Sequence, residues 1–192
     1  MKKDYFLDLF NLNQTVFTVK NISLLWQTAD MPFVNKKLYR YTKANKLFRI
    51  KKAIYAKNEN FDRLEFAVKL WTPSYISFET VTAKAGLTFQ YYSQIFIATY
   101  QSKEIEILKQ KYVFRKLKDS VLTNLAGIEN TGTYNIASAE RAFLDIIYLN
   151  KNYYFDNLSN LNWDKVFEIL PIYQNKNMIK MVNKHYKESK NA

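Results

Sequence analysis

Apolar residues at helical spacing predict two short helices near the start of the chain. The segment DYFLDLFNLN places Phe6, Leu9 and Phe10 on one side of a helix. After a turn and a short extended stretch, Thr18 suits the N-cap of the next helix. That helix carries apolar residues at the same spacing, namely Val19, Ile22, Leu25 and Trp26.

A third helix is predicted to begin at Pro32 and to have two contrasting faces. Proline suits the first helical turn because its φ is preset and its missing N–H is not needed there. On a helical wheel one stripe consists of Val34, Leu38, Tyr41 and Asn45. The opposite side gathers Lys36, Arg40 and Lys43. We therefore expect one face to pack and the other to be cationic.

Two short strands are predicted after the third helix. Asn45 can take the left-handed conformation usually given to glycine at a helix end. The segments LFRI and AIYAK then have the character of strands around Lys51 and Lys52. The order helix, helix, helix, hairpin describes a winged helix-turn-helix, in which the third helix enters a DNA groove and the hairpin touches the backbone. It also fits a small helical subdomain whose basic face is only solvated.

The rest of the chain mixes helical and strand periods. RLEFAVKLW and SAERAFLDIIYL have helical spacing, whereas IFIATY and EIEILKQKYVFRKL resemble a buried strand and a hairpin. Two Ser-x-Glu sequences, starting at Ser77 and Ser138, predict helix starts with a hydroxyl cap. We expect an α+β protein with a winged helix-turn-helix domain in residues 1–59 and a mixed α/β domain in residues 60–192. The polar stretch KNENFDR marks the boundary.

The positive charge is concentrated in the first third of the chain. The formal net charge is +12, but 24 of the 29 basic residues are Lys, a bias that AT-rich coding DNA produces without functional demand. Residues 1–60 hold 12 basic and 4 acidic residues (net +8), and residues 61–192 hold 17 and 13 (net +4). Residues 36–57 carry nine basic residues and no acid. The placement makes an acidic partner such as nucleic acid plausible for the N-terminal part.

The inventory of chemical groups does not predict an enzyme. The chain has no cysteine, one histidine (His185) and three isolated glycines, so it has no thiolate site, no His cluster and no phosphate-cradling loop. Arg141 and Asp145, four residues apart, predict an ordinary ion pair. We therefore predict no catalytic residue, no metal ligand and no cofactor. No signal peptide or long apolar run is present, so we expect a cytoplasmic protein that does not enter the membrane.

Four stretches in order give the chain a family resemblance: FTVKNISLLW, LYRYTKANKLFRIKKAIYAK, PSYISFETVTAKAGL and IASAERAFLDIIYL. The chain resembles the AbiEi-type antitoxins, the transcriptional regulators of abortive-infection (type IV) toxin-antitoxin systems in phage defence. The resemblance implies an N-terminal winged helix that binds inverted repeats in the promoter of its own operon. It also implies a C-terminal domain needed to counter a nucleotidyltransferase-like toxin. Asn45 and Ala53 depart from the family, which usually has Gly at the helix exit and in the wing.

The combined hypothesis assigns a DNA-binding role to eight residues. Lys36, Arg40 and Lys43 would lie in or along the major groove of double-stranded DNA, with Asn35 and Tyr39 at its edge. Thr18, Lys51 and Lys52 would hold phosphates. The alternatives are a protein-interaction module that has lost DNA binding, and a plain transcription regulator without a toxin partner.

Overall fold

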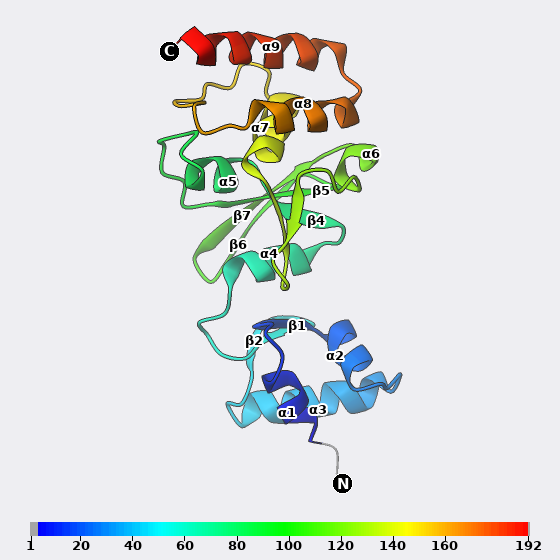
Figure 1. The fold of residues 1–192 in the computed structure, drawn as a ribbon. Helices are drawn as coiled ribbons and strands as arrows, with labels where there is room; N and C mark the ends of the chain where they lie inside the picture. Colours follow the sequence, from blue (N-terminus) through cyan, green and yellow to red (C-terminus); the bar gives the residue numbers. More distant parts are fainter. Residues whose placement is uncertain (1–3, 192) are drawn as a thin grey trace. The chain divides into compact units, whose positions relative to one another are not determined.

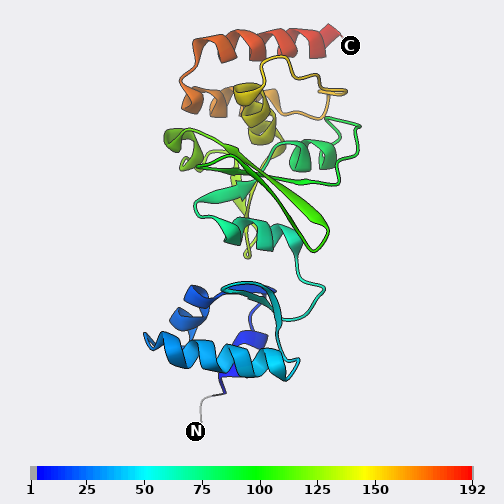
Figure 2. The same ribbon diagram turned by 180° about the vertical axis from the view of Figure 1, so that it is seen from behind.

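The computed structural model describes residues 4–191. They form two compact units, and the chain passes from the first to the second between Leu70 and Trp71. Figure 1 shows the path of the chain, and Figure 2 shows it from behind. The described residues form an α+β protein with two separate sheets. No helix among them is both long enough and apolar enough to cross a membrane.

The N-terminal unit combines short helices with a three-stranded antiparallel sheet. Its elements in chain order are α1 (Tyr5–Phe10), β1 (Val16–Thr18), α2 (Val19–Leu25), α3 (Met31–Lys43), β2 (Phe48–Lys51), β3 (Ile54–Ala56) and α4 (Arg63–Leu70). The strand order is β1-β3-β2. The three predicted helices and the hairpin are therefore present close to their predicted bounds.

The core of this unit comes from the predicted apolar stripes. Its buried residues are Leu9, Phe17, Val19, Ile22, Trp26, Val34, Leu38, Leu47 and Tyr55. Phe10 differs from the prediction, because it is exposed at the last position of α1 while Leu9 is buried. Phe10 instead packs at the surface of α1, where its ring lies 5.7 Å from that of Phe6.

The division between the units lies after α4, whereas the sequence placed it after residue 59. The side chains of α4 explain this position. The Glu65 carboxylate accepts hydrogen bonds from Thr15 N and Thr15 Oγ1, at 2.8 and 2.7 Å, just before β1. Lys69 lies 2.6 Å from Glu65 and also donates to the Val16 carbonyl. These bonds join α4 to β1 and so to the N-terminal unit.

The second unit contains a six-stranded mixed sheet. Its elements are β4 (Ser74–Ile76), α5 (Glu79–Lys84), β5 (Ile95–Thr99), β6 (Lys103–Ile107), β7 (Gln110–Lys116), α6 (Asp119–Leu122), β8 (Ile128–Asn130), β9 (Asn135–Ala137), α7 (Ala139–Leu149), α8 (Trp163–Ile169), the 3₁₀ turn η1 (Leu170–Tyr173) and α9 (Lys176–Asn191). The strand order is β6-β7-β5-β4-β9-β8. Strand β5 is parallel to β7 and β4 to β9, and the other pairs are antiparallel.

Helix α7 occupies the centre of the second unit. All residues from Glu140 to Ile147 are buried, and Figures 1 and 2 show α7, α8 and α9 on the same side of the sheet. Ser138 caps α7 by accepting a hydrogen bond from Arg141 N at 3.2 Å, as predicted. The predicted cap at Ser77 is wrong. Phe78 is the N-cap of α5, and the Ser77 hydroxyl instead donates to Asp145 at 2.8 Å.

Candidate nucleic-acid interface

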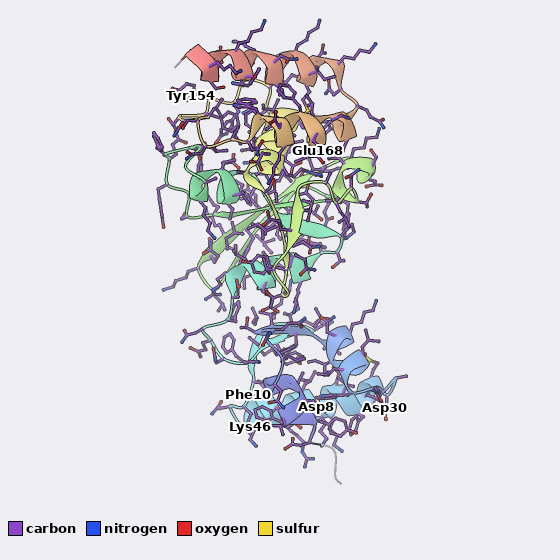
Figure 3. The ribbon with its side chains drawn as sticks, in the orientation of Figure 1. Asp8, Phe10, Asp30, Lys46, Tyr154 and Glu168 are labelled. Carbon is purple, nitrogen blue, oxygen red and sulfur yellow. The ribbon has the colours of Figure 1, made fainter. Side chains whose placement is uncertain are left out.

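Helix α3 is the longest helix of the N-terminal unit, and both of its ends are well defined. Asp30 caps the start by accepting a hydrogen bond from Phe33 N at 2.9 Å, and Pro32 lies in the first turn. At the other end Asn45 has φ +52°, and Lys46 N donates to the Tyr41 carbonyl at 2.8 Å. This is a Schellman closure with Asn in the usual place of Gly. Figure 3 labels Asp30 and Lys46 at the two ends.

One face of α3 is fixed against the core. Val34 and Leu38 are buried, as the helical wheel predicts. Tyr41 is half-buried, with its ring 5.4 Å from that of Phe6 and 6.4 Å from that of Trp26. This packing sets which way the remaining side chains of α3 point.

The opposite face of α3 is exposed along its length. It carries all five of the α3 residues that the sequence singled out: Asn35, Lys36, Tyr39, Arg40 and Lys43. Tyr39 is 61% exposed, and Lys43 Nζ lies 5.8 Å from the centre of its ring. In residues 4–191 no acidic side chain forms an ion pair with Lys36, Arg40 or Lys43. The positive charge of this face is therefore uncompensated by the described residues.

The hairpin turn between β2 and β3 presents two further lysines. Lys51 and Lys52 are exposed. The turn is closed by Ala53, whose φ is +63°, and the ladder has an irregularity between Arg49 and Lys51. The Ala53 carbonyl accepts a hydrogen bond from Val19 N at 3.0 Å, which holds the turn against the start of α2.

Thr18 lies beside this turn, but its hydroxyl is already engaged. It is opposite Ile54 in the β1–β3 ladder. Its Oγ1 accepts from Asn21 N at 3.1 Å and donates to Asn21 Oδ1 at 2.6 Å, which makes a capping box at the start of α2. The fold thus brings Thr18 together with Lys51 and Lys52. No hydrogen bond, ion pair or ring contact in the described part of the chain joins this group to the exposed face of α3.

The second unit contains a buried polar network that the sequence interpretation missed. Arg141 and Asp145 form the predicted pair at 3.2 Å, but both side chains are completely buried. The guanidinium also donates to the carbonyls of Val121 at 2.7 Å and Ala126 at 2.8 Å. The pair is therefore a core element rather than an ordinary surface ion pair.

Three hydroxyls complete the coordination of the Asp145 carboxylate. Tyr173 donates to Oδ1 at 2.6 Å, while Tyr75 and Ser77 donate to Oδ2 at 2.9 and 2.8 Å. Burial, followed by the charge of Asp145, raises the pKa of both tyrosines well above the usual value, so they remain donors. All acceptor positions of the Asp145 carboxylate therefore face a donor.

A sequence signal for this network does exist. Arg141 and Asp145 interrupt an otherwise apolar helix. Tyr75, in β4, and Ser77, just after its end, are two residues apart, the spacing at which side chains of an extended segment point to the same side. The partners come from parts of the chain far apart in sequence, so spacing alone could not join them.

No protein-family model matches the chain, and no curated protein matches it. Among residues 4–191 no group of three or more His, Asp or Glu side chains is arranged to hold a metal ion.

Proposed function

We propose that the protein is a DNA-binding autorepressor and the antitoxin of an AbiE-like, type IV toxin-antitoxin pair. In this proposal residues 4–56 act as a winged helix-turn-helix on double-stranded promoter DNA. Helices α2 and α3 form the helix-turn-helix, and the β2–β3 hairpin is the wing. The order of elements and the β1-β3-β2 sheet support this assignment.

The single observation that carries the proposal is the exposed cationic face of α3. Recognition helices in this class present one face to the major groove while the other packs on the domain core. Arg40 would read a guanine edge, since its planar guanidinium can donate two parallel hydrogen bonds. Lys36 and Lys43, one turn to either side, would contact phosphates or base edges.

Lys51 and Lys52 are proposed as phosphate contacts of the wing. A different role is proposed for Thr18, because its hydroxyl belongs to the capping box of α2. It would act by keeping α2 and the wing in place rather than by binding phosphate.

DNA binding is tested by titrating the protein into labelled DNA from upstream of its own gene, with a scrambled duplex for comparison. Arg40→Ala should weaken binding to the upstream DNA by about tenfold or more, because a bidentate base contact contributes about 1 to 3 kcal/mol of discrimination. Lys84→Ala, at an exposed lysine of α5, is the matched control and should bind normally. Lys51→Ala should lower the log–log salt slope by about 0.9. Equal affinity for both duplexes, or no effect of Arg40→Ala, would overturn the assignment.

The antitoxin part of the proposal rests on the family resemblance. It requires a reading frame for a nucleotidyltransferase-like toxin next to this gene. Co-expression of that toxin should arrest growth without this protein and permit growth with it. Failure of the rescue, with DNA binding intact, would leave a plain transcription regulator.

A further inference from the structure

Three large aromatic side chains of the second unit are strongly exposed on two neighbouring loops. Phe89 and Tyr91, in the loop between α5 and β5, are 72% and 92% exposed, and Tyr154, between α7 and α8, is 78% exposed. The loops lie side by side, because Asp156 accepts a hydrogen bond from Phe89 N at 2.7 Å and donates its own N–H to the Leu87 carbonyl at 3.0 Å. A cluster of exposed apolar rings usually marks a binding surface.

A hollow of about 660 Å³ adjoins Tyr154. The loop contributes Lys151, Tyr153 and Tyr154 to its lining, and α9 contributes Met181, Lys184 and His185. The Tyr153 hydroxyl is 3.3 Å from that of Tyr92, so this wall is braced by the α5–β5 loop. Tyr154 is labelled in Figure 3.

The charge around the hollow is positive. Lys151 and Lys184 are exposed, and α9 holds five lysines between residues 176 and 190 against the single acid Glu188. Glu188 also lines the hollow, but it lies 3.7 Å from Lys184 with both side chains exposed, which makes a weak, screened pair. Burial lowers the pKa of His185, while the Glu188 carboxylate, 3.5 Å from its Nδ1, opposes this shift. The neutral ring is therefore favoured at physiological pH and adds no positive charge to the hollow.

We propose that this surface binds a single-stranded nucleic acid, with a base stacked on Tyr154 and phosphates held by Lys151 and Lys184. Exposed aromatic faces next to cations are the combination that recognises unpaired bases joined by phosphates. A duplex keeps its bases inside the stack and cannot use Tyr154 in this way. The site lies in the second unit and is separate from the duplex-binding role proposed for α3.

The stacking contact is tested with the full chain and fluorescein-labelled 12-mers of oligo-U and oligo-dT, with a duplex of the same length for comparison. Both single strands should bind, and Tyr154→Ala should weaken binding about tenfold, the size of one lost base–aromatic contact. Tyr154→Phe should bind normally because it keeps the ring. Tyr154→Leu should behave like Tyr154→Ala because it keeps only apolar bulk. Tyr100→Ala, at an exposed tyrosine between β5 and β6, is the control.

The phosphate contacts are tested by salt dependence. Lys184→Ala should lower the log–log slope for single strands by about 0.7, whereas Arg40→Ala should leave single-strand binding unchanged. Unchanged single-strand binding by Arg40→Ala would show that this site and the α3 interface are separate. Either proposal can then be contradicted without the other. Full binding by Tyr154→Leu, a loss of duplex binding in Tyr154→Ala as large as its loss of single-strand binding, or no binding of either oligonucleotide would overturn the proposal. The last outcome would point to a protein ligand for these rings.

Discussion

Ala53 is the residue whose backbone conformation fits its side chain least well in the β2–β3 hairpin. Its φ of +63° lies in the left-handed region, which costs a residue with a Cβ about 1 to 2 kcal/mol. The turn is nevertheless closed and hydrogen-bonded to Val19, so contacts with the surrounding structure offset this strain.

Ala53→Gly should therefore stabilise the protein. We expect the free energy of unfolding to rise by about 1 kcal/mol, since the relief of strain exceeds the extra entropy of glycine in the unfolded chain. Urea denaturation measures the change. Ala44→Gly is the matched control, because Ala44 has φ −85° and ends α3; it should be neutral or destabilising. A lower unfolding midpoint for Ala53→Gly would contradict this account.

His185 should make stability depend on pH. Burial against Phe143 and Phe155 lowers its pKa, while Glu188 opposes the shift and Lys184 adds to it. A histidine whose pKa is lower in the folded state binds fewer protons there than in the unfolded state, so stability falls as pH drops through about 6.5.

The melting temperature should therefore decrease from about pH 7.5 to about pH 5.5. Because His185 is the only histidine, His185→Gln should flatten this dependence, whatever its effect at pH 7.5. An unchanged slope in the variant would show that other groups are responsible.

Among the secondary structure elements, α4 depends on one buried carboxylate for its attachment to β1. Glu65 is fully buried, accepts three hydrogen bonds from residues 15 and 16, and pairs with Lys69. Removing such a group leaves the donors of residues 15 and 16 without their acceptor and Lys69 without its counter-ion.

Glu65→Ala should cost about 3 kcal/mol or more of unfolding free energy. Glu59→Ala, at an exposed acid in the loop before α4, should change it by less than about 0.5 kcal/mol. Urea denaturation of both variants makes the comparison. Similar small effects would mean that α4 is held chiefly by its apolar residues.

Most elements were predictable from local pattern, because their causes are local. Thr18 and Ser138 cap the helices they were expected to cap, and the apolar stripe of α3 is buried at Val34 and Leu38. Ser77 has the same sequence context as Ser138 but faces Asp145 instead. A cap preference of about 1 kcal/mol is easily exceeded by a hydrogen bond to a buried carboxylate.

At the scale of the whole molecule, the local sequence pattern could not predict which residues far apart in the chain come into contact. The exposure of Asn35, Tyr39 and Arg40 follows from the wheel of a single helix. The Arg141 network instead joins β4, α7, η1 and the segment around 121–126. An i, i+4 spacing gives the same signal for a surface pair and for a core pair, and only burial separates them.

Arg141→Ala should destabilise the second unit selectively. Breaking a buried pair typically costs about 3 to 5 kcal/mol because the remaining charge has lost its counter-ion. Trp26 reports on the N-terminal unit, and Trp71 and Trp163 report on the second. With the other tryptophans changed to Phe, the transition at Trp163 should shift to lower urea while that at Trp26 stays in place.

Arg115→Ala provides the comparison within the same unit. Arg115 pairs with Glu79 but is 29% exposed, so water can partly take the place of its guanidinium. The loss of unfolding free energy should therefore be smaller than in Arg141→Ala. A common shift of both tryptophan signals in Arg141→Ala would mean that the two units unfold as one.

The backbone also bears on how this sequence can change over time. Seven described residues other than glycine have positive φ, among them Gln27, Asn45 and Ala53. Alanine and glycine codons differ by a single base, so one mutation at Ala53 could relieve the strain of its positive φ. The chain therefore has an accessible stabilising substitution at Ala53, and the stability gained there would let it accept a destabilising change elsewhere on its surface.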